Sequence, residues 1–223
     1  VDYIKAVFGF YEAYSENDTV FIDGKPFPML RQQKKSDKNE YLCIADFIAP
    51  KSSGKRDFIG AFAVTGGAGS DYLIRKYENE GDEYSALLMK SLLDRLAEAA
   101  TEWLHEKVRR EYWAYAPDEK LSVSEMFSVK YRGIRPAVGY PSIPDQSVNF
   151  ALHKMLRSEE IGVSLTENGV MYPNASVSGF FLAHPESSYF AVGEISEEQL
   201  DDYATRKGEE AKYIRKFLLG NLS

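Results

Sequence analysis

The hydrophobic positions at the start of the chain fall into short runs that are typical of β-strands. Residues 3–11 are rich in aromatic and β-branched side chains, and turn-forming residues at 17–18 end this pattern. A second run at residues 20–22 is followed by the turn pair Asp23-Gly24. Because β-forming runs separated by such turn residues favour pairing of neighbouring strands, we predict a hairpin in this region.

Two longer and mostly apolar runs follow, at residues 42–49 and 58–65. Continuous apolar runs of this length, bounded by loop residues, are typical of strands that are buried on both faces. We therefore predict two central strands, joined by a loop at residues 50–55. The Gly-rich segment at residues 66–70 has neither the G-x-G-x-x-G nor the Walker spacing, so we interpret it as a strand-to-helix connection.

The longest helical pattern runs from Asp82 to about Trp113. Gly81-Asp82 supplies a start signal and a cap, and Pro117 lies just past the end. Two neighbouring apolar stripes follow this helix, one of Leu88, Leu92, Leu96, Ala99 and Trp103, the other of Leu93, Ala97, Ala100, Leu104 and Val108. Such a wide apolar face predicts that the helix packs against the sheet.

The second half of the chain alternates short elements with turns. A Pro/Gly-rich passage at residues 133–144 precedes a helix at 148–157. Strand-like runs follow at residues 161–163, 171–174, 177–182 and 189–192, and two amphipathic helices are expected near residues 196–207 and 208–219. Because no repeat, linker or low-complexity segment interrupts the chain, we predict one α+β domain over residues 1–223.

Charge and cysteine content narrow the classes of partner and the compartment. With 34 acidic and 27 basic side chains, the net charge of -7 opposes binding to nucleic acid. The lone Cys43 lies in an apolar run, which predicts a buried, inert thiol and a reducing, cytoplasmic environment. A membrane span needs about 18 consecutive apolar residues, and no such segment occurs.

Neither metal binding nor nucleophilic catalysis is indicated. The three histidines, His105, His153 and His184, have no H-E-x-x-H partner and no His/Cys cluster at metal-ligand spacing. No G-x-S-x-G nucleophile motif occurs either. We therefore predict no metal site and no catalytic residue in this chain.

The passage Arg135 to Tyr140 is the strongest candidate for a ligand site. Pro136 and Gly139 favour an irregular backbone, which leaves amide and carbonyl groups free for a ligand. Arg135 can donate two parallel hydrogen bonds to a carboxylate, and Tyr140 can flank a ring. The alternative is a connecting loop whose arginine pairs with an Asp or Glu of the same chain.

Ten sequence blocks, in order and at similar spacing, resemble a known family. They lie at residues 30–33, 45–51, 57–67, 94–99, 104–106, 112–117, 133–141, 165–167, 175–179 and 189–192. Together they are similar to the C-terminal activation domain of cobalamin-dependent methionine synthase. The resemblance implies a curved, mainly antiparallel sheet packed by one long helix and several shorter helices.

The same resemblance implies a function. In that family the domain binds S-adenosylmethionine in a shallow groove, and a flavodoxin-type donor supplies an electron to the oxidised cobalamin. S-adenosylmethionine then remethylates the cobalamin, which sits on a separate domain of the same enzyme. The family's cobalamin-binding sequence Asp-x-His-x-x-Gly is absent here, so we expect this chain not to bind cobalamin or turn over alone.

The resemblance also assigns site residues. Arg135 would hold the carboxylate of the methionine part, and Glu98 would meet its positively charged amino group. This pairing suits a zwitterion, because charge-assisted hydrogen bonds then satisfy both ends.

Five further residues complete the assigned site. Ala137 and Gly139 would contribute backbone contacts, and Tyr140 would line the groove. Tyr189 and Phe190 match a Tyr-Tyr pair of the family beside the ligand, although the second ring here lacks the hydroxyl.

The chain departs from the family at its start. The family domain begins earlier, with an Asp-Trp-Thr-Pro-Phe-Phe motif whose Asp contacts S-adenosylmethionine, and Val1 already lies within a predicted strand. We expect a piece of a longer protein whose groove is incomplete. Two alternatives remain: a stand-alone binding or scaffold protein with this fold but no methyl-donor binding, and a free-standing methyltransferase, which the missing Gly-rich nucleotide fingerprint disfavours.

Overall fold

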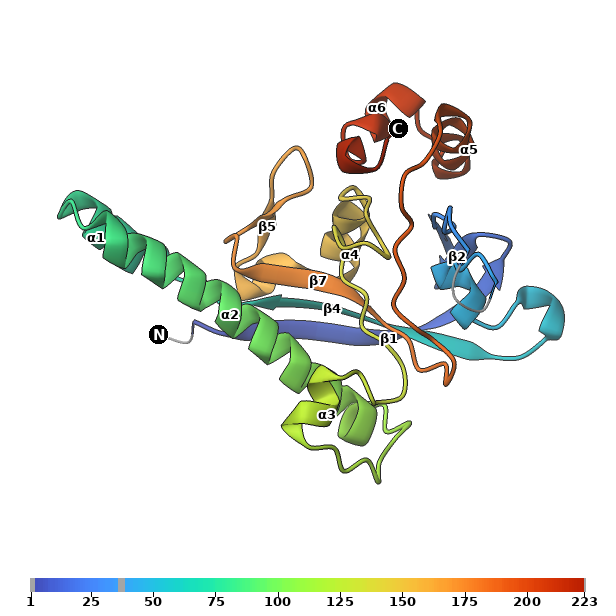
Figure 1. Ribbon diagram of the computed structural model, residues 1–223, viewed down its shortest axis with the longest axis horizontal. Helices are drawn as coiled ribbons and strands as arrows, with labels where there is room; N and C mark the ends of the chain where they lie inside the picture. Colours follow the sequence, from blue (N-terminus) through green and yellow to red (C-terminus); the bar gives the residue numbers. More distant parts are fainter. Residues whose placement is uncertain (1–2, 36–38, 223) are drawn as a thin grey trace.

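A five-stranded antiparallel sheet forms the frame of the molecule (Figure 1). The computed structural model describes residues 3–35 and 39–222, so the predicted position of Val1 lies outside the described residues. The strands, in the spatial order β3-β2-β1-β4-β7, are β3 (Lys25–Pro28), β2 (Thr19–Ile22), β1 (Lys5–Glu16), β4 (Asp57–Thr65) and β7 (Ser176–Phe181). The curled, antiparallel sheet with its helices confirms the predicted α+β fold.

The start of the sheet is the predicted hairpin. β1 pairs with β2 through a two-residue turn, since Glu16 lies opposite Thr19. Asn17 takes a positive φ of 51° in this turn, a conformation that Asn tolerates better than most residues. Asp23 and Gly24 form a second two-residue turn, in which both residues have a positive φ, and this turn leads into β3.

β4 is buried on both faces and separates two hydrophobic cores. Ile59, Ala61 and Ala63 face a larger core, while Phe62 and Val64 face a smaller one. This alternation follows from the two-residue period of a strand, and it confirms the prediction of a central strand at residues 58–65.

The other predicted central strand, at residues 42–49, is wrong. This segment forms a short 3₁₀ helix, Ile44–Phe47, whose apolar side chains enter the larger core. The carboxylate of Asp46 accepts a hydrogen bond from the backbone N–H of Cys43 at 2.8 Å and also binds Arg31. A side chain that caps its own backbone competes with strand pairing, and this polar residue stands in the middle of the apolar run.

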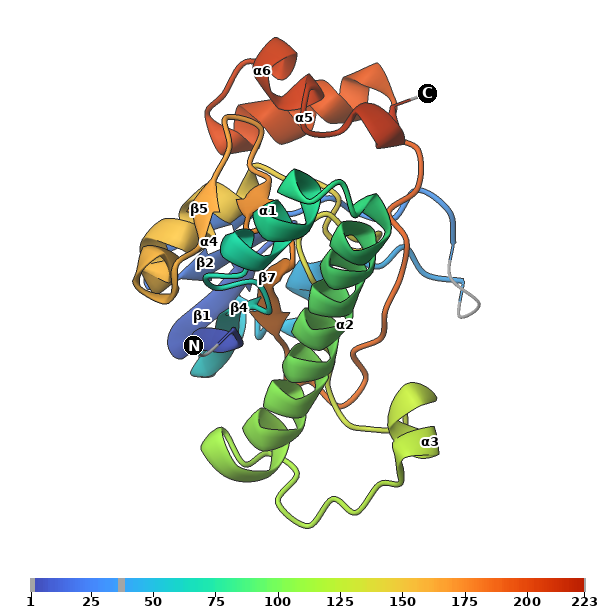
Figure 2. The ribbon, with the colours of Figure 1, turned by 90° about the vertical axis from the view of Figure 1, so that its left-hand side faces the viewer.

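The long helix crosses one face of the sheet (Figure 2). α1 (Asp71–Asn79) precedes α2 (Glu83–Lys107), which continues into a π-helix at Val108–Tyr112. The carboxylate of Asp82 accepts a hydrogen bond from the N–H of Ser85 at 3.0 Å, which confirms the predicted helix and its cap.

Only one of the two apolar stripes of α2 packs against the sheet. Leu93, Ala97, Leu104 and Val108 are buried, so the prediction holds for their stripe. The other stripe is exposed: Leu88, Leu92 and Trp103 have 56%, 51% and 56% of their surface accessible. A straight helix meets a sheet along one narrow strip, and within the described residues no element covers the second stripe.

The remaining elements lie around the sheet, with α3 beyond the C-terminal end of α2 (Figure 1). They are α3 (Val123–Phe127), α4 (Val148–Leu156), the pair β5 (Ser164–Leu165) and β6 (Met171–Tyr172), α5 (Glu197–Lys207) and α6 (Ala211–Arg215). α4 and α5 contribute to the larger core. The predicted strand at residues 189–192 is wrong: this segment is irregular chain, in which the N–H of Val192 donates to the carbonyl of Pro141 at 2.9 Å. The last helix is shorter than predicted.

Candidate functional site

The Pro/Gly-rich passage lies beside β7, where it forms an interrupted edge of the sheet. The N–H of Val138 donates to the carbonyl of Ser178 at 2.9 Å, and the N–H of Phe180 donates to the carbonyl of Pro136 at 3.0 Å. The two backbones approach so closely at Gly179 that a Cβ there would lie 2.2 Å from the oxygen of Pro136. A glycine at this position is therefore a condition for the site's geometry.

A glycine turn then directs Tyr140 toward α2. Gly139 has a φ of 85°, in the region that favours glycine, and its N–H donates to the carbonyl of Ile143 at 2.8 Å. The hydroxyl of Tyr140 donates to Oε1 of Glu98 at 2.5 Å. This hydrogen bond, with a smaller effect of burial, raises the pKa of Tyr140 to about 12.

Arg135 is held between two carboxylates of α2. Its Nε donates to Oε1 of Glu102 at 2.8 Å, its Nη2 also binds this oxygen, and Nη2 lies 3.6 Å from Oε2 of Glu98. The Arg135 side chain is only 13% exposed. Burial acts to lower the pKa of Arg135, but the charge and hydrogen bond of Glu102, together with Tyr189 and Glu98, raise the pKa overall, so the guanidinium stays cationic.

Tyr189 joins this group from the opposite side. Its hydroxyl accepts a hydrogen bond from the backbone N–H of Arg135 at 3.0 Å. Tyr131 lies next to it, and its pKa is raised by burial and by the charge and hydrogen bond of Tyr189. Both ends of Arg135, backbone and guanidinium, are thus fixed by neighbouring side chains.

Two further residues assigned from the sequence contribute backbone to the same place. Ala137 is buried in the smaller core, and its carbonyl accepts from the N–H of Tyr140 at 3.3 Å. Among the described residues, none accepts a hydrogen bond from the N–H of Ala137. Together with the Gly139 turn, this leaves irregular backbone next to Glu98 and Arg135.

Phe190 lies apart from the polar group. Its ring is buried in the larger core, 6.5 Å from the ring of Phe47 between centroids. Its backbone is fixed by Ser142, whose hydroxyl donates to the carbonyl of Phe190 at 2.5 Å. Tyr189 and Phe190 therefore point in opposite directions, as neighbours in extended chain do.

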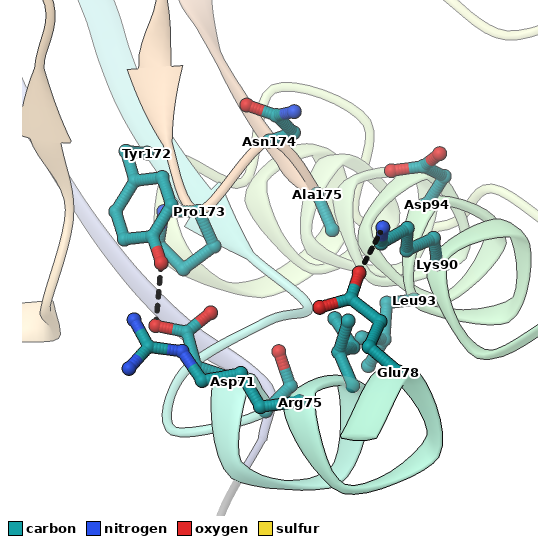
Figure 3. A pocket seen from close by; sticks show the side chains of 12 residues that line it. Asp71, Arg75, Glu78, Lys90, Leu93, Asp94, Tyr172, Pro173, Asn174 and Ala175 are labelled. Atoms are coloured by element: carbon teal, nitrogen blue, oxygen red, sulfur yellow. Dashed lines mark hydrogen bonds and ion pairs between the residues drawn. The ribbon is translucent and has the colours of Figure 1, made fainter. Parts of the chain in front are cut away.

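A trough runs along α2 from this cluster. Its first part is a hollow of about 400 Å³ lined by residues such as Glu98, Asp94, Val138 and Tyr140. A second hollow of about 410 Å³ adjoins it and shares Asp94, Asn174 and Ala175 (Figure 3). There Tyr172 donates to Asp71 at 2.5 Å and Lys90 to Glu78 at 2.8 Å, so the walls carry both charges.

A buried polar layer lies beneath the site. His105 is fully buried, its Nε2 lies 3.3 Å from the hydroxyl of Tyr115, and its ring stacks on Phe181. Burial, with the charges of Arg109 and Arg135, lowers the pKa of His105 well below its ordinary value. The ring is therefore neutral and serves the packing beneath Arg135.

The prediction of a buried thiol is confirmed. Cys43 is fully buried, and burial raises the pKa of its thiol to about 12. Within residues 3–35 and 39–222, no cluster of three His, Cys, Asp or Glu side chains is arranged to hold a metal ion. None of the helices in these ranges is long and apolar enough to cross a bilayer.

Sequence reasoning missed Glu102, the strongest partner of Arg135. A signal was present, because Glu98 and Glu102 are four residues apart and share one face of a helix. The alternative in which Arg135 pairs with an acid of the same chain is thus also borne out. The structure brings together Glu98, Arg135, Tyr140 and Tyr189, with the backbone of Ala137 and Gly139 beside them.

Comparison with known proteins agrees with this fold. The model of the family described as "Vitamin B12 dependent methionine synthase, activation domain" matches residues 3–208. A crystal structure of the MetH reactivation domain bound to AdoHcy is 42% identical to this chain, with a TM-score of 0.92. The match covers 99% of this chain and 70% of that one. The chain therefore belongs to the activation-domain family of vitamin B12-dependent methionine synthases.

Proposed function

We propose that residues 1–223 form one domain that binds S-adenosylmethionine in the trough along α2. The observation that carries this proposal is the opposition of Arg135 and Glu98, whose Nη2 and Oε2 atoms lie 3.6 Å apart. A cation and an anion so close together match the carboxylate and the ammonium of an amino-acid ligand. AdoHcy, the ligand of the relative, shares this amino-acid end with S-adenosylmethionine.

Each assigned residue has a part in this binding. Arg135 holds the ligand carboxylate and Glu98 the ammonium. The free N–H of Ala137 and the Gly139 turn supply backbone contacts, while Tyr140 and Tyr189 line the groove. Phe190 contributes indirectly: its ring is buried in the larger core and so fixes the segment that carries Tyr189.

The bound ligand supplies a methyl group, and this chain supplies its position. In this proposal the acceptor is cobalamin on a separate domain of the same methionine synthase, after a flavodoxin-type electron donor in the cytoplasm has reduced it from its oxidised form. Transfer of the methyl group leaves S-adenosylhomocysteine. Arg135 and Glu98 fix the amino-acid end, so the remainder of the ligand extends along α2. No residue of this chain takes a catalytic part, and the isolated chain does not turn over.

Isothermal titration calorimetry with S-adenosylmethionine tests the proposal. Arg135→Ala is expected to abolish the binding heat, because the ligand carboxylate loses the guanidinium that is proposed to hold it. Arg56→Ala is the matched control, since Arg56 forms an exposed ion pair with Glu12 at 3.1 Å, far along the sheet. Binding that is equal in the unaltered chain and in Arg135→Ala would contradict the site assignment.

A further inference from the structure

Glu102 occupies one edge of the Arg135 guanidinium and leaves the other edge open. A single oxygen, Oε1, accepts hydrogen bonds from both Nε and Nη2. None of the described residues accepts a hydrogen bond from Nη1. The Nη1–Nη2 end of the fork is therefore available to a second carboxylate while Glu102 stays in place.

We infer that Glu102 is a positioning residue that orients Arg135 toward the carboxylate of the ligand. The inference rests on the proposed function and extends it by one residue. Arginine has a long, flexible side chain, and holding it in one rotamer before the ligand arrives reduces the entropy lost on binding. Glu102 fixes the guanidinium end, and Tyr189 fixes the backbone N–H of the same residue.

Glu102 also keeps Arg135 from neutralising Glu98. The next carboxylate within reach of Arg135 is Glu98, at 3.6 Å from Nη2. Without Glu102, the guanidinium gains most by moving onto Glu98, which removes both the cation for the ligand carboxylate and the anion for its ammonium. Glu102 thus keeps the guanidinium of Arg135 at 3.6 Å from Glu98, short of a direct hydrogen bond.

The alternative role for Glu102 is that of a competitor, whose carboxylate occupies the position that the ligand carboxylate would take on Arg135. A carboxylate that had to leave before the ligand could bind would lower the affinity, and its removal would raise it. The geometry points away from this role, because Glu102 binds the Nε side of the fork and leaves the Nη1 side open.

The test compares two ligands that differ only in the group that Arg135 is proposed to bind. S-adenosylmethionine and its decarboxylated form are titrated calorimetrically into the 223-residue chain and into Glu102→Gln and Glu102→Ala. We expect both variants to bind S-adenosylmethionine about tenfold more weakly, since a charge-assisted contact loses its orientation. For decarboxylated S-adenosylmethionine we expect a change below about twofold, since no carboxylate remains to be positioned.

Glu106→Gln provides the matched control. Glu106 lies one turn further along α2 and also pairs with an arginine, accepting from Nη1 of Arg110 at 2.7 Å, but it does not line the trough. Its affinity for both ligands should equal that of the unaltered chain. Thermal melts of all variants accompany the titrations, and Glu102→Gln keeps the shape of the side chain if Glu102→Ala fails to fold.

The outcomes separate this inference from the function on which it rests. Equal losses of affinity for both ligands would assign Glu102 a purely structural role. A gain in affinity for S-adenosylmethionine would show that Glu102 competes with the ligand carboxylate. Either result overturns the inference but not the proposed function, as long as binding still depends on Arg135. Absence of S-adenosylmethionine binding in the unaltered chain overturns the proposed function together with the inference.

Discussion

The hydroxyl of Tyr140 lies 2.5 Å from Oε1 of Glu98, which joins the glycine turn at the sheet edge to the middle of α2. The two residues are 42 positions apart in the sequence. Because this bond raises the pKa of Tyr140 to about 12, the hydroxyl remains a donor at neutral pH. The bond therefore holds the Glu98 carboxylate with one oxygen toward Tyr140 and the other toward Arg135.

Tyr140→Phe should weaken S-adenosylmethionine binding about three- to tenfold, because Glu98 loses the donor that orients it. Calorimetry on the variant measures this loss. The melting temperature should change little, since Tyr140 is half exposed. An unchanged affinity would show that Glu98 is oriented without Tyr140.

Gly179→Ala should abolish ligand binding. The added Cβ would lie 2.2 Å from the carbonyl oxygen of Pro136, so the passage that carries Arg135 must move away from β7. Gly220→Ala is the control, because no atom lies within 4 Å of a Cβ at that position. Calorimetric titration of both variants checks this expectation, and full binding by Gly179→Ala would contradict the close approach.

Asp145→Ala should lower the free energy of unfolding by about 3–5 kcal/mol, the typical cost of leaving a buried ion unpaired. The Asp145 carboxylate is 1% exposed and accepts hydrogen bonds from Lys207 at 2.6 Å and from Tyr203 at 2.8 Å. It therefore fixes α5 to the passage that follows the site. Urea denaturation measures the loss, with the exposed Asp118→Ala as the control, which should be near neutral.

The stability of the protein should fall as the pH drops below 6.5, the ordinary pKa of histidine. Burial, with the charges of Arg109 and Arg135, keeps His105 neutral in the folded state, while the unfolded chain takes up a proton near that pH. The unfolded state then binds more protons, so the free energy of unfolding decreases by up to about 1.4 kcal/mol per pH unit.

The free energy of unfolding, measured by urea denaturation at several pH values between about 8 and 5, tests this dependence. In this interval histidine titrates, while carboxylates stay largely ionised. His105→Phe should flatten the slope below pH 6.5, because it removes the group that titrates. An equal slope in the variant would assign the dependence to other groups.

Much of the fold follows from local patterns in the sequence. β4 and α2 were predictable because their apolar runs, caps and turn residues all favour the same structure. The strand predicted at residues 42–49 was wrong, because these apolar side chains are buried as part of a short 3₁₀ helix that Asp46 caps. An apolar composition predicts that a segment is buried, but it does not predict that the segment pairs as a strand.

The residues of the candidate cluster could be named from the sequence, but the contacts between them could not. Arg135, Glu98, Tyr140 and Tyr189 meet as the resemblance implied, while the pairing of Arg135 with Glu102 depends on how α2 is rotated above the passage. The same rotation decides that the stripe with Leu93 is buried and the stripe with Leu92 exposed. Helical periodicity gives the faces of a helix but not the direction in which each face points.

Because β4 is buried on both faces, the geometry of the site depends on the packing of the opposite face of the sheet. Phe62 shares the smaller core with Ala137, while its neighbour Ala61 shares the larger core with residues of α5. A single strand thus couples both cores, and the molecule should melt as one cooperative unit. A shortened form of this protein that lacks α5 and α6 would therefore have a looser ligand groove, although neither helix lines the groove.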